Sequence, residues 1–196
     1  LVPLRTTGGL DTVGVRCPNH PITRAVIAAA DVPIAAPSGN TSGRPSPTCI
    51  ADMIEDMDGK IEGMFDGGPC AVGVESTIER PKAPGMKYRH YAPKAPVTVV
   101  TGDPEASARY IQTHLPEGAG VICFTEYKDL FPGRSIHDLG LAADKAEQAR
   151  RVFDALREFD HEAVTEIYAQ CPDTAGLGLA VANRLKKAAG FHVIEV

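Results

Sequence analysis

The chain has 196 residues, of which 43% are hydrophobic and 23% charged, and its formal net charge is −5 at pH 7. This length and hydrophobic content are ample for the globular core of one or two domains. Its longest apolar stretch is interrupted by Asp31 and Pro33, and its N-terminus lacks the pattern of a secretory signal, so we expect a cytoplasmic protein without a membrane span. The acidic excess lies in residues 95–196, where ten Lys or Arg face fifteen Asp or Glu, and this argues against a stable complex with nucleic acid.

The first half of the chain predicts two short helices between strands. We expect a strand over Thr12–Arg16, a helix over Pro21–Ala30, a strand over Val32–Ala36, a helix that follows a cap at Ser46 and ends at Gly59, and a strand over 71–78. Two-residue alternation places Val13 and Val15 on one face of the first strand, which we expect to be the core face. Because this is a thin core for a separate domain, we expect further partner segments.

A proline-rich segment divides the chain. Between Glu79 and Pro96, four prolines, one glycine and five basic residues interrupt any periodic pattern, which is typical of an interdomain linker. Five strand-like runs then alternate with helical patterns: Val97–Val100, Gly120–Thr125, Ser135–Leu139, Thr165–Ala169 and His192–Val196. This alternation predicts a parallel α/β sheet. We therefore place domains at residues 1–79 and 97–196, joined by a linker at 80–96.

Helix signals in the second half are clear. Asp103 can cap a helix that has Pro104 at its first position. A later helix carries an apolar stripe of Ala146, Ala149, Val152, Phe153 and Leu156. The sequence TAGLGLAVANR supplies only Gly176 and Gly178 and not the full dinucleotide-binding fingerprint, so the start and packing of a helix explain these glycines.

The sequence DTVGVR places three groups suited to an anion on one face of the first strand. Thr12 offers a hydroxyl, Gly14 a bare backbone, and Arg16 a planar guanidinium that can pair with a carboxylate or phosphate through two hydrogen bonds. A surface salt bridge on an edge strand explains the same pattern equally well. The pattern alone leaves both interpretations open.

The sequence AAPSGNTSGRPSP, which follows a predicted strand, favours phosphate binding. Its glycines let the backbone approach a ligand closely, Ser38 and Asn40 offer short hydrogen bonds, and Arg44 and a helix start at Ser46 add positive charge. The loop lacks the Gly-Lys-Ser/Thr signature of a Walker motif, and many surface turns share its composition.

Two further clusters have alternative interpretations. A carboxylate and two hydroxyls at residues 75–77 either cap a turn or line a ligand pocket. The linker sequence KYRHY either stacks on a base and neutralises phosphate or forms a solvated basic tether. The five cysteines are scattered, without zinc-finger spacing, so we expect neither a metal site nor a disulfide framework.

Four motifs occur in order along the chain: LDTVGVRCPNHP, PIAAPSGNTSGRPSP, DGGPCAVGVESTI and APGMKYRHYAPKAPV. Together they resemble the two-domain threonylcarbamoyl-AMP synthases. The resemblance implies a partial YrdC-like twisted α/β catalytic domain followed by a small Rossmann-like parallel α/β domain. It is strong over residues 1–96, whereas the remainder matches in being an α/β domain at the expected place.

The resemblance implies a nucleotidyltransferase that joins L-threonine, bicarbonate and ATP, with Mg²⁺, into threonylcarbamoyl-AMP and pyrophosphate. The product would supply a downstream tRNA threonylcarbamoyl-transferase complex, which modifies the adenosine next to the anticodon.

The resemblance also implies roles for individual residues. Around ATP it places Thr12, Ser38, Asn40 and Ser46, together with Arg89, His90 and Tyr91 of a linker that folds back over the cleft. Around threonine it places Arg16, which pairs with the carboxylate, the backbone of Ala36, and Ser76. Arg16 and Ser38 would be the residues on which catalysis depends most.

The chain departs from the family pattern in two places. The family's catalytic domain begins before the position of Leu1 with a motif of lysine and arginine, and the family carries a further strand and an RPG turn where Ile78 here runs into Glu79. We expect that residues are omitted from the chain at both places. A non-catalytic RNA- or nucleotide-binding YrdC-like protein, a truncated inactive paralogue and a carbamoyl transferase of hydrogenase maturation are the alternatives.

Overall fold

The computed structural model describes residues 2–7, 11–73 and 91–196. Two helices lie in the first half, α1 (Pro21–Ala30) and α2 (Ile50–Met57). The second half runs in the order β1 (Val97–Thr101), α3 (Pro104–His114), β2 (Gly120–Cys123), η2 (Thr125–Leu130), β3 (Ile136–Asp138), α4 (Lys145–Glu158), η3 (Phe159–His161), β4 (Ile167–Gln170), α5 (Leu177–Ala188) and β5 (Val193–Glu195). Within the described residues, no helix has the length and apolar character needed to cross a membrane.

A five-stranded sheet organises the second half. Its order is β3-β2-β4-β1-β5, and every neighbouring pair is parallel. Val97 of β1 and Gly120 of β2 both lie opposite Ile167 of the central strand β4. All five strands expected from the sequence are present, and the predicted parallel α/β class is confirmed.

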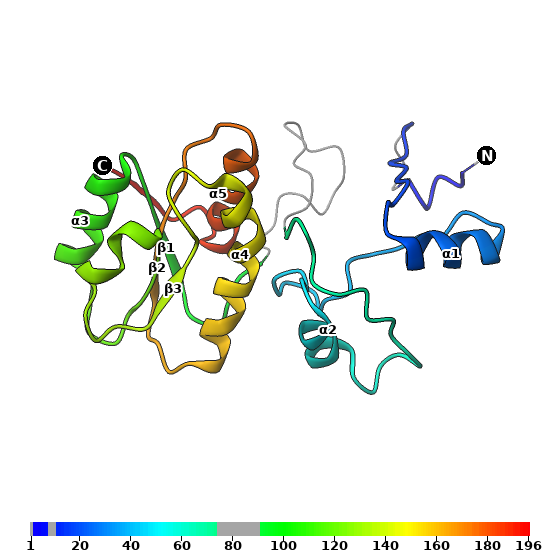
Figure 1. Ribbon diagram of the computed structural model, residues 1–196, viewed down its shortest axis with the longest axis horizontal. Helices are drawn as coiled ribbons and strands as arrows, with labels where there is room; N and C mark the ends of the chain where they lie inside the picture. Colours follow the sequence, from blue (N-terminus) through cyan, green and yellow to red (C-terminus); the bar gives the residue numbers. More distant parts are fainter. Residues whose placement is uncertain (1, 8–10, 74–90) are drawn as a thin grey trace.

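Helices cover both faces of this sheet, as Figure 1 shows. On one face α3 and η2 pack over Val100, Val121 and Cys123. On the other face α4 and α5 pack over a larger apolar core that includes Phe124 and Ile167. The second half is therefore a three-layer α/β/α unit in which β1, β2 and β4 are mostly buried and the edge strands β3 and β5 are more exposed.

The helix signals in this half are mostly confirmed. Asp103 accepts hydrogen bonds from the backbone N–H groups of Glu105 (2.9 Å) and Ala106 (3.2 Å), which identifies it as the N-cap of α3. Four of the five residues expected in the apolar stripe of α4 are buried: Ala149, Val152, Phe153 and Leu156. Ala146, in the first turn of the helix, is exposed.

The two glycines near the start of α5 have structural reasons. Gly176 adopts φ +54°, a left-handed conformation that L side chains rarely adopt. A Cβ atom on Gly178 would lie 2.2 Å from the carbonyl oxygen of Asp173. Backbone conformation and close packing therefore account for both residues.

The first half differs from the sequence prediction in its strands. Helix α1 forms as expected, but residues 12–16 and 32–36 form no strand, and Val13 (44% exposed) and Val15 (85% exposed) do not face a core. A strand is stable only when another strand satisfies its backbone hydrogen bonds, and no such partner lies in the described part of this half. The strand expected over 71–78 is absent at 71–73, and its remaining residues lie outside the described ranges.

Candidate functional site

The polar loop of residues 36–48 connects α1 to α2. Within it, the side-chain amide nitrogen of Asn40 donates to the carbonyl oxygens of Thr41 (3.0 Å) and Arg44 (3.1 Å), which closes the turn. These two bonds fix the orientation of the amide, and its oxygen is buried without a hydrogen-bond partner in the described part of the chain. Asn40 therefore presents an unused acceptor, which suits a donor such as a hydroxyl or amino group.

Helix α2 begins later than the sequence predicts, and the carboxylate of Asp52 lies at its N-terminus. Its N-cap is Cys49 rather than Ser46, and the carboxylate of Asp52 accepts hydrogen bonds from the backbone N–H groups of Thr48 (2.8 Å) and Cys49 (3.4 Å). This carboxylate satisfies the N–H group of the cap residue and places a negative charge beside the helix start, which disfavours a phosphate there.

Arg44 is also committed to acidic side chains. Its guanidinium contacts Asp56 (2.6 Å), Glu55 (2.8 Å) and Asp160 (3.3 Å). A guanidinium with three carboxylate partners has little remaining capacity for a phosphate. The hydroxyls and backbone N–H groups of the loop are therefore better suited than Arg44 to the phosphate that the sequence predicts here.

The remaining candidate residues are mostly exposed. Thr12 and Arg16 lie on the extended segment before α1, and within the described ranges neither has a hydrogen bond or ion pair. Ala36 and Ser38 lie exposed after α1. Ser46 is half-buried near α2. Ser76, Arg89 and His90 lie outside the described residues.

Tyr91 lies against the α/β half rather than over the polar loop. Its ring centroid is 5.1 Å from that of Phe153 on α4, and the guanidinium carbon of Arg184 on α5 lies 5.1 Å from the same centroid. The next residue brings the chain back to the loop, because the backbone N–H of Ala92 donates to the carbonyl oxygen of Gly43 (3.2 Å). The end of the linker thus touches both halves.

Sequence reasoning missed a buried cluster of charges beside the loop. Arg157 of α4 donates to the carbonyl oxygen of Pro45 (2.5 Å) and to the carboxylate of Asp56 (2.7 Å), and its side chain is only 2% exposed. A signal for it existed, since residue 157 follows Phe153 by four positions and therefore lies on the apolar stripe of the helix. A charged residue at such a position needs a buried partner.

Asp56 lies at the centre of this cluster. Burial disfavours the ionised form of its carboxyl group, but the hydrogen bond from Arg157 and the charges of Arg157 and Arg44 hold the pKa of Asp56 below its ordinary value. The carboxylate is therefore ionised at neutral pH and bridges the two guanidinium groups.

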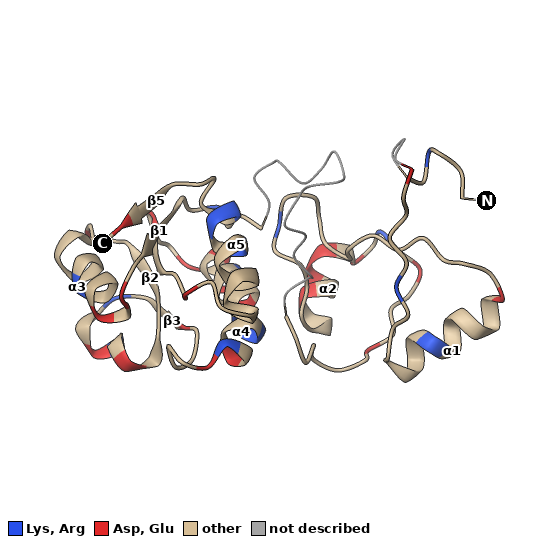
Figure 2. Ribbon diagram, turned by 90° about the horizontal axis from the view of Figure 1, so that it is seen from above, with Lys and Arg blue, Asp and Glu red and all other residues tan. Residues whose placement is uncertain are grey.

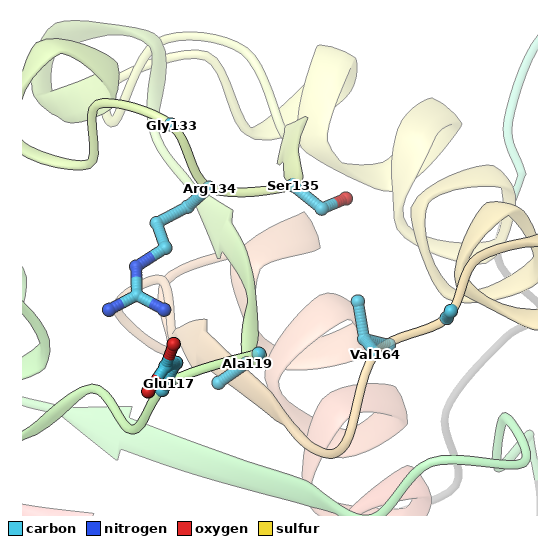
Figure 3. A pocket seen from close by; sticks show the side chains of 8 residues that line it. Glu117, Ala119, Gly133, Arg134, Ser135 and Val164 are labelled. Carbon is cyan, nitrogen blue, oxygen red and sulfur yellow. The ribbon is translucent and has the colours of Figure 1, made fainter.

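The cavity in Figure 3 lies elsewhere, in the α/β half. Residues 117–119, 133–135 and 163–164, which line it, precede β2, β3 and β4, so it opens at the amino ends of the strands. Ligands of parallel α/β sheets bind at the carboxyl ends. Arg134 points toward Glu117 in this view, and its guanidinium donates to the carbonyl oxygen of Pro116 (2.9 Å). None of the candidate residues lines this cavity.

Comparison with known proteins identifies the family. The family model described as "Threonylcarbamoyl-AMP synthase, C-terminal domain" matches residues 51–190, and the model described as "Telomere recombination" matches residues 1–90. The chain belongs to the threonylcarbamoyl-AMP synthase family.

Curated relatives carry the same name. The threonylcarbamoyl-AMP synthase of Bacillus subtilis is 38% identical over 232 residues, which span 97% of this chain and 67% of that protein. The enzyme of Pyrococcus abyssi is 38% identical over 242 residues, which span all of this chain and 69% of that protein. Because 242 aligned residues exceed the 196 of this chain, that relative has residues within the matched span that this chain lacks.

Solved structures agree with the family assignment. The crystal structure of P. abyssi Sua5 complexed with L-threonine superposes with a TM-score of 0.80 at 36% identity and covers all of this chain and 69% of that one. A double-alanine variant of the same protein gives a TM-score of 0.86 over 68% of its chain. The resemblance that the four motifs carry is thus confirmed.

The described residues form no cluster of side chains that could bind a divalent metal ion. They contain no group of three or more His, Cys, Asp or Glu that could bind one. The carboxylates nearest the loop, Asp52, Glu55 and Asp56, lie beside Arg44 or Arg157 or accept backbone N–H groups. A Mg²⁺ ion usually needs one or two carboxylates together with substrate phosphates, and these side chains do not fit that requirement as they stand.

Proposed function

We propose that the protein to which this chain belongs is an L-threonylcarbamoyladenylate synthase whose polar loop and preceding segment bind ATP and threonine. The observation that carries the proposal is the 38% identity to curated synthases over nearly the whole chain. The likeness to a relative solved in complex with L-threonine supports threonine as a ligand.

The reaction requires positioning more than a nucleophilic side chain. The amine of threonine and bicarbonate form a carbamate with loss of water, and a carbamate oxygen then attacks the α-phosphorus of ATP while pyrophosphate leaves. Charge neutralisation and alignment of the reacting groups are the main contributions that a protein can make to such a step. The candidate residues are hydroxyls, an amide and a guanidinium, which suit this task.

The roles follow from the chemistry of each side chain. In this proposal the exposed Arg16 pairs with the threonine carboxylate, to which Ser76 and the backbone of Ala36 also turn. Thr12, Ser38 and Ser46 donate hydrogen bonds to ATP. Asn40 uses its unpartnered oxygen to accept from a hydroxyl or amino group of the nucleotide, since its nitrogen already closes the loop.

In this proposal the residues of the linker have two different roles, whereas the resemblance implies one. We propose that Arg89 and His90 lie near the nucleotide, whereas the packing of Tyr91 on Phe153 supports an anchoring role. Mg²⁺ enters, in this proposal, as part of the ATP complex. The reaction takes place in the cytoplasm, and the product passes to a tRNA threonylcarbamoyl-transferase complex without a stable complex between this protein and nucleic acid.

Identification of the product tests the proposal. Full-length protein incubated with ATP, Mg²⁺, threonine and ¹³C-labelled bicarbonate should form a nucleotide that contains AMP, threonine and one labelled carbon, which mass spectrometry would detect. A folded protein that binds ATP but forms no labelled nucleotide would instead be a non-catalytic nucleotide-binding member of the family.

The roles of Arg16 and Ser38 can be separated by kinetics. Arg16→Ala should raise the KM for threonine by about 10- to 100-fold, because it removes a charge-assisted pair with the carboxylate. Ser38→Ala should raise the KM for ATP by about fivefold, the effect of one neutral hydrogen bond. Arg24→Ala, on exposed α1, is the matched control for Arg16. Equal effects of both variants on both substrates would contradict these roles.

A further inference from the structure

Helix α4 contacts the first half of the chain at several points. A Cβ atom on Gly73 would lie 2.6 Å from the carbonyl oxygen of Arg150, so this backbone segment lies directly on the helix. One turn further along, Phe153 packs on Tyr91, and Asp154 accepts a hydrogen bond from the hydroxyl of Thr48. In Figure 1, α4 is the part of the α/β half that faces α2.

The last turn of α4 holds the polar loop through Arg157. One nitrogen of its guanidinium donates both to the carbonyl oxygen of Pro45, inside the loop, and to Asp56 on α2. Its other nitrogens face carboxylates at longer range, with Nη1 3.5 Å from Glu55 and Nε 3.9 Å from Asp52. Figure 2 shows this acidic side of α2 beside α4. Four partners from two segments thus surround one buried guanidinium.

A second contact closes the same junction from the following η3. Asp160, whose side chain is 3% exposed, accepts from the guanidinium of Arg44 (3.3 Å) and from the backbone N–H of Lys94 (2.7 Å). Arg44 also binds Asp56, so the two arginines share one buried carboxylate. The loop, α2 and the end of the linker are therefore fixed to one end of the α/β half.

These contacts hold the backbone of the polar loop in place without adding a group that could bind a ligand. Pro45 lies between Arg44 and Ser46, and the ion pairs of Arg44 and the hydrogen bond to Pro45 from Arg157 all come from α2 or the α/β half. Removing one partner from a buried charge cluster leaves the others uncompensated, so a loop that moves away from Arg157 loses stability. A displacement of about 1 Å in a binding group can change a rate by about 100-fold.

We infer that Arg157 is a positioning residue for ATP, which holds the polar loop through Pro45 and Asp56 so that Ser38, Asn40 and Ser46 keep their places. The inference rests on the proposed ATP site in this loop. It makes the α/β half part of the binding machinery for the nucleotide, although no atom of that half needs to touch ATP.

Kinetics of matched arginine variants in the full-length protein test this inference. Arg157→Gln should raise the KM for ATP by about 10- to 100-fold while the KM for threonine changes far less. Arg157→Lys keeps the charge but not the forked geometry, so it should recover only part of the loss. Arg151→Gln, on the exposed side of the same helix, should leave both constants within about twofold of the wild-type values.

Hydrogen exchange provides a readout that does not depend on activity. In Arg157→Gln, backbone amides of residues 41–58 should exchange at least about tenfold faster, whereas β1, β2 and β4 should remain protected. Asp160→Asn offers a second variant, and it should produce a weaker form of both effects because Arg44 keeps Asp56 and Glu55 as partners.

Three results would overturn the inference. The KM for ATP could remain within about twofold of wild type in Arg157→Gln. The apparent kcat could fall together with the melting temperature while both KM values stay unchanged, which would show a purely structural role. Exchange at residues 41–58 could be unchanged. Absence of synthase activity in the wild-type protein would contradict the proposed function instead, and the exchange result would still decide whether Arg157 holds the loop.

Discussion

The two halves of the molecule respond differently to the same kind of sequence pattern. In residues 97–196 every expected strand pairs with another, and all the buried hydrophobic residues of the described chain lie there. In residues 11–73 alternating valines and isoleucines give exposed coil, with Val15 and Ile34 at 85% and 49% exposure. Periodicity therefore shows which residues are suited to a strand, but only a neighbouring strand makes one.

The contacts between the two halves are of a different kind from those inside the α/β half. The first half is held to α4 and η3 by buried charges and backbone packing, and Tyr91 of the linker adds an apolar contact. Burial of apolar surface is nondirectional, whereas buried ion pairs specify one geometry. The α/β half thus supplies the stability, and the junction on α4 supplies the placement of the loop.

Thiol reactivity gives the largest contrast between the halves. Burial raises the pKa of Cys123 to about 12 and that of Cys171 to about 11, whereas Cys17 in the first half is exposed. Because the thiolate is the reactive form and burial also blocks access, we expect a disulfide reagent at about pH 8 to modify Cys17 at least about a hundredfold faster than either buried thiol. Labelling followed by mass spectrometry measures these rates. Comparable rates at Cys17 and Cys123 in the folded chain would contradict the contrast in burial.

Truncation of apolar side chains should show the next largest difference. Leu156 is fully buried beneath the sheet, so Leu156→Ala should lower the free energy of unfolding by about 2–5 kcal/mol. Val15→Ala should change it by no more than about 0.5 kcal/mol, since little of that side chain is buried. Urea unfolding followed by circular dichroism measures both. A loss at Val15 as large as that at Leu156 would show that a core of equal weight lies in the first half.

Acid should weaken the junction by a smaller amount. The folded-state pKa of Asp56 is lowered from 3.8, so its ionisation stabilises the fold above that value, and the contribution is lost as the pH falls through the folded pKa. The stability difference between wild type and Asp56→Asn should therefore be constant from about pH 7 to 5 and shrink at about pH 3.5. Urea unfolding at these three pH values tests this. A difference that grows on acidification would mean that the carboxyl group binds as the neutral acid.

Several features could be predicted because their causes are local. The Asp103 cap, the strands of the α/β half and the family motifs are visible in short segments of sequence. The sequence predicts a cap at Ser46, but α2 begins after Cys49, where Asp52 accepts the N–H group of the cap residue in a capping box. The partners of Arg44 could not be predicted, since Asp160 is 116 residues away along the chain.

Release of pyrophosphate from ATP and Mg²⁺ by the full-length protein is the decisive measurement of threonylcarbamoyl-AMP synthase activity. We expect release when threonine and bicarbonate are both present, and little when either is omitted. A folded protein that releases pyrophosphate without threonine, or that releases none, would not be such a synthase.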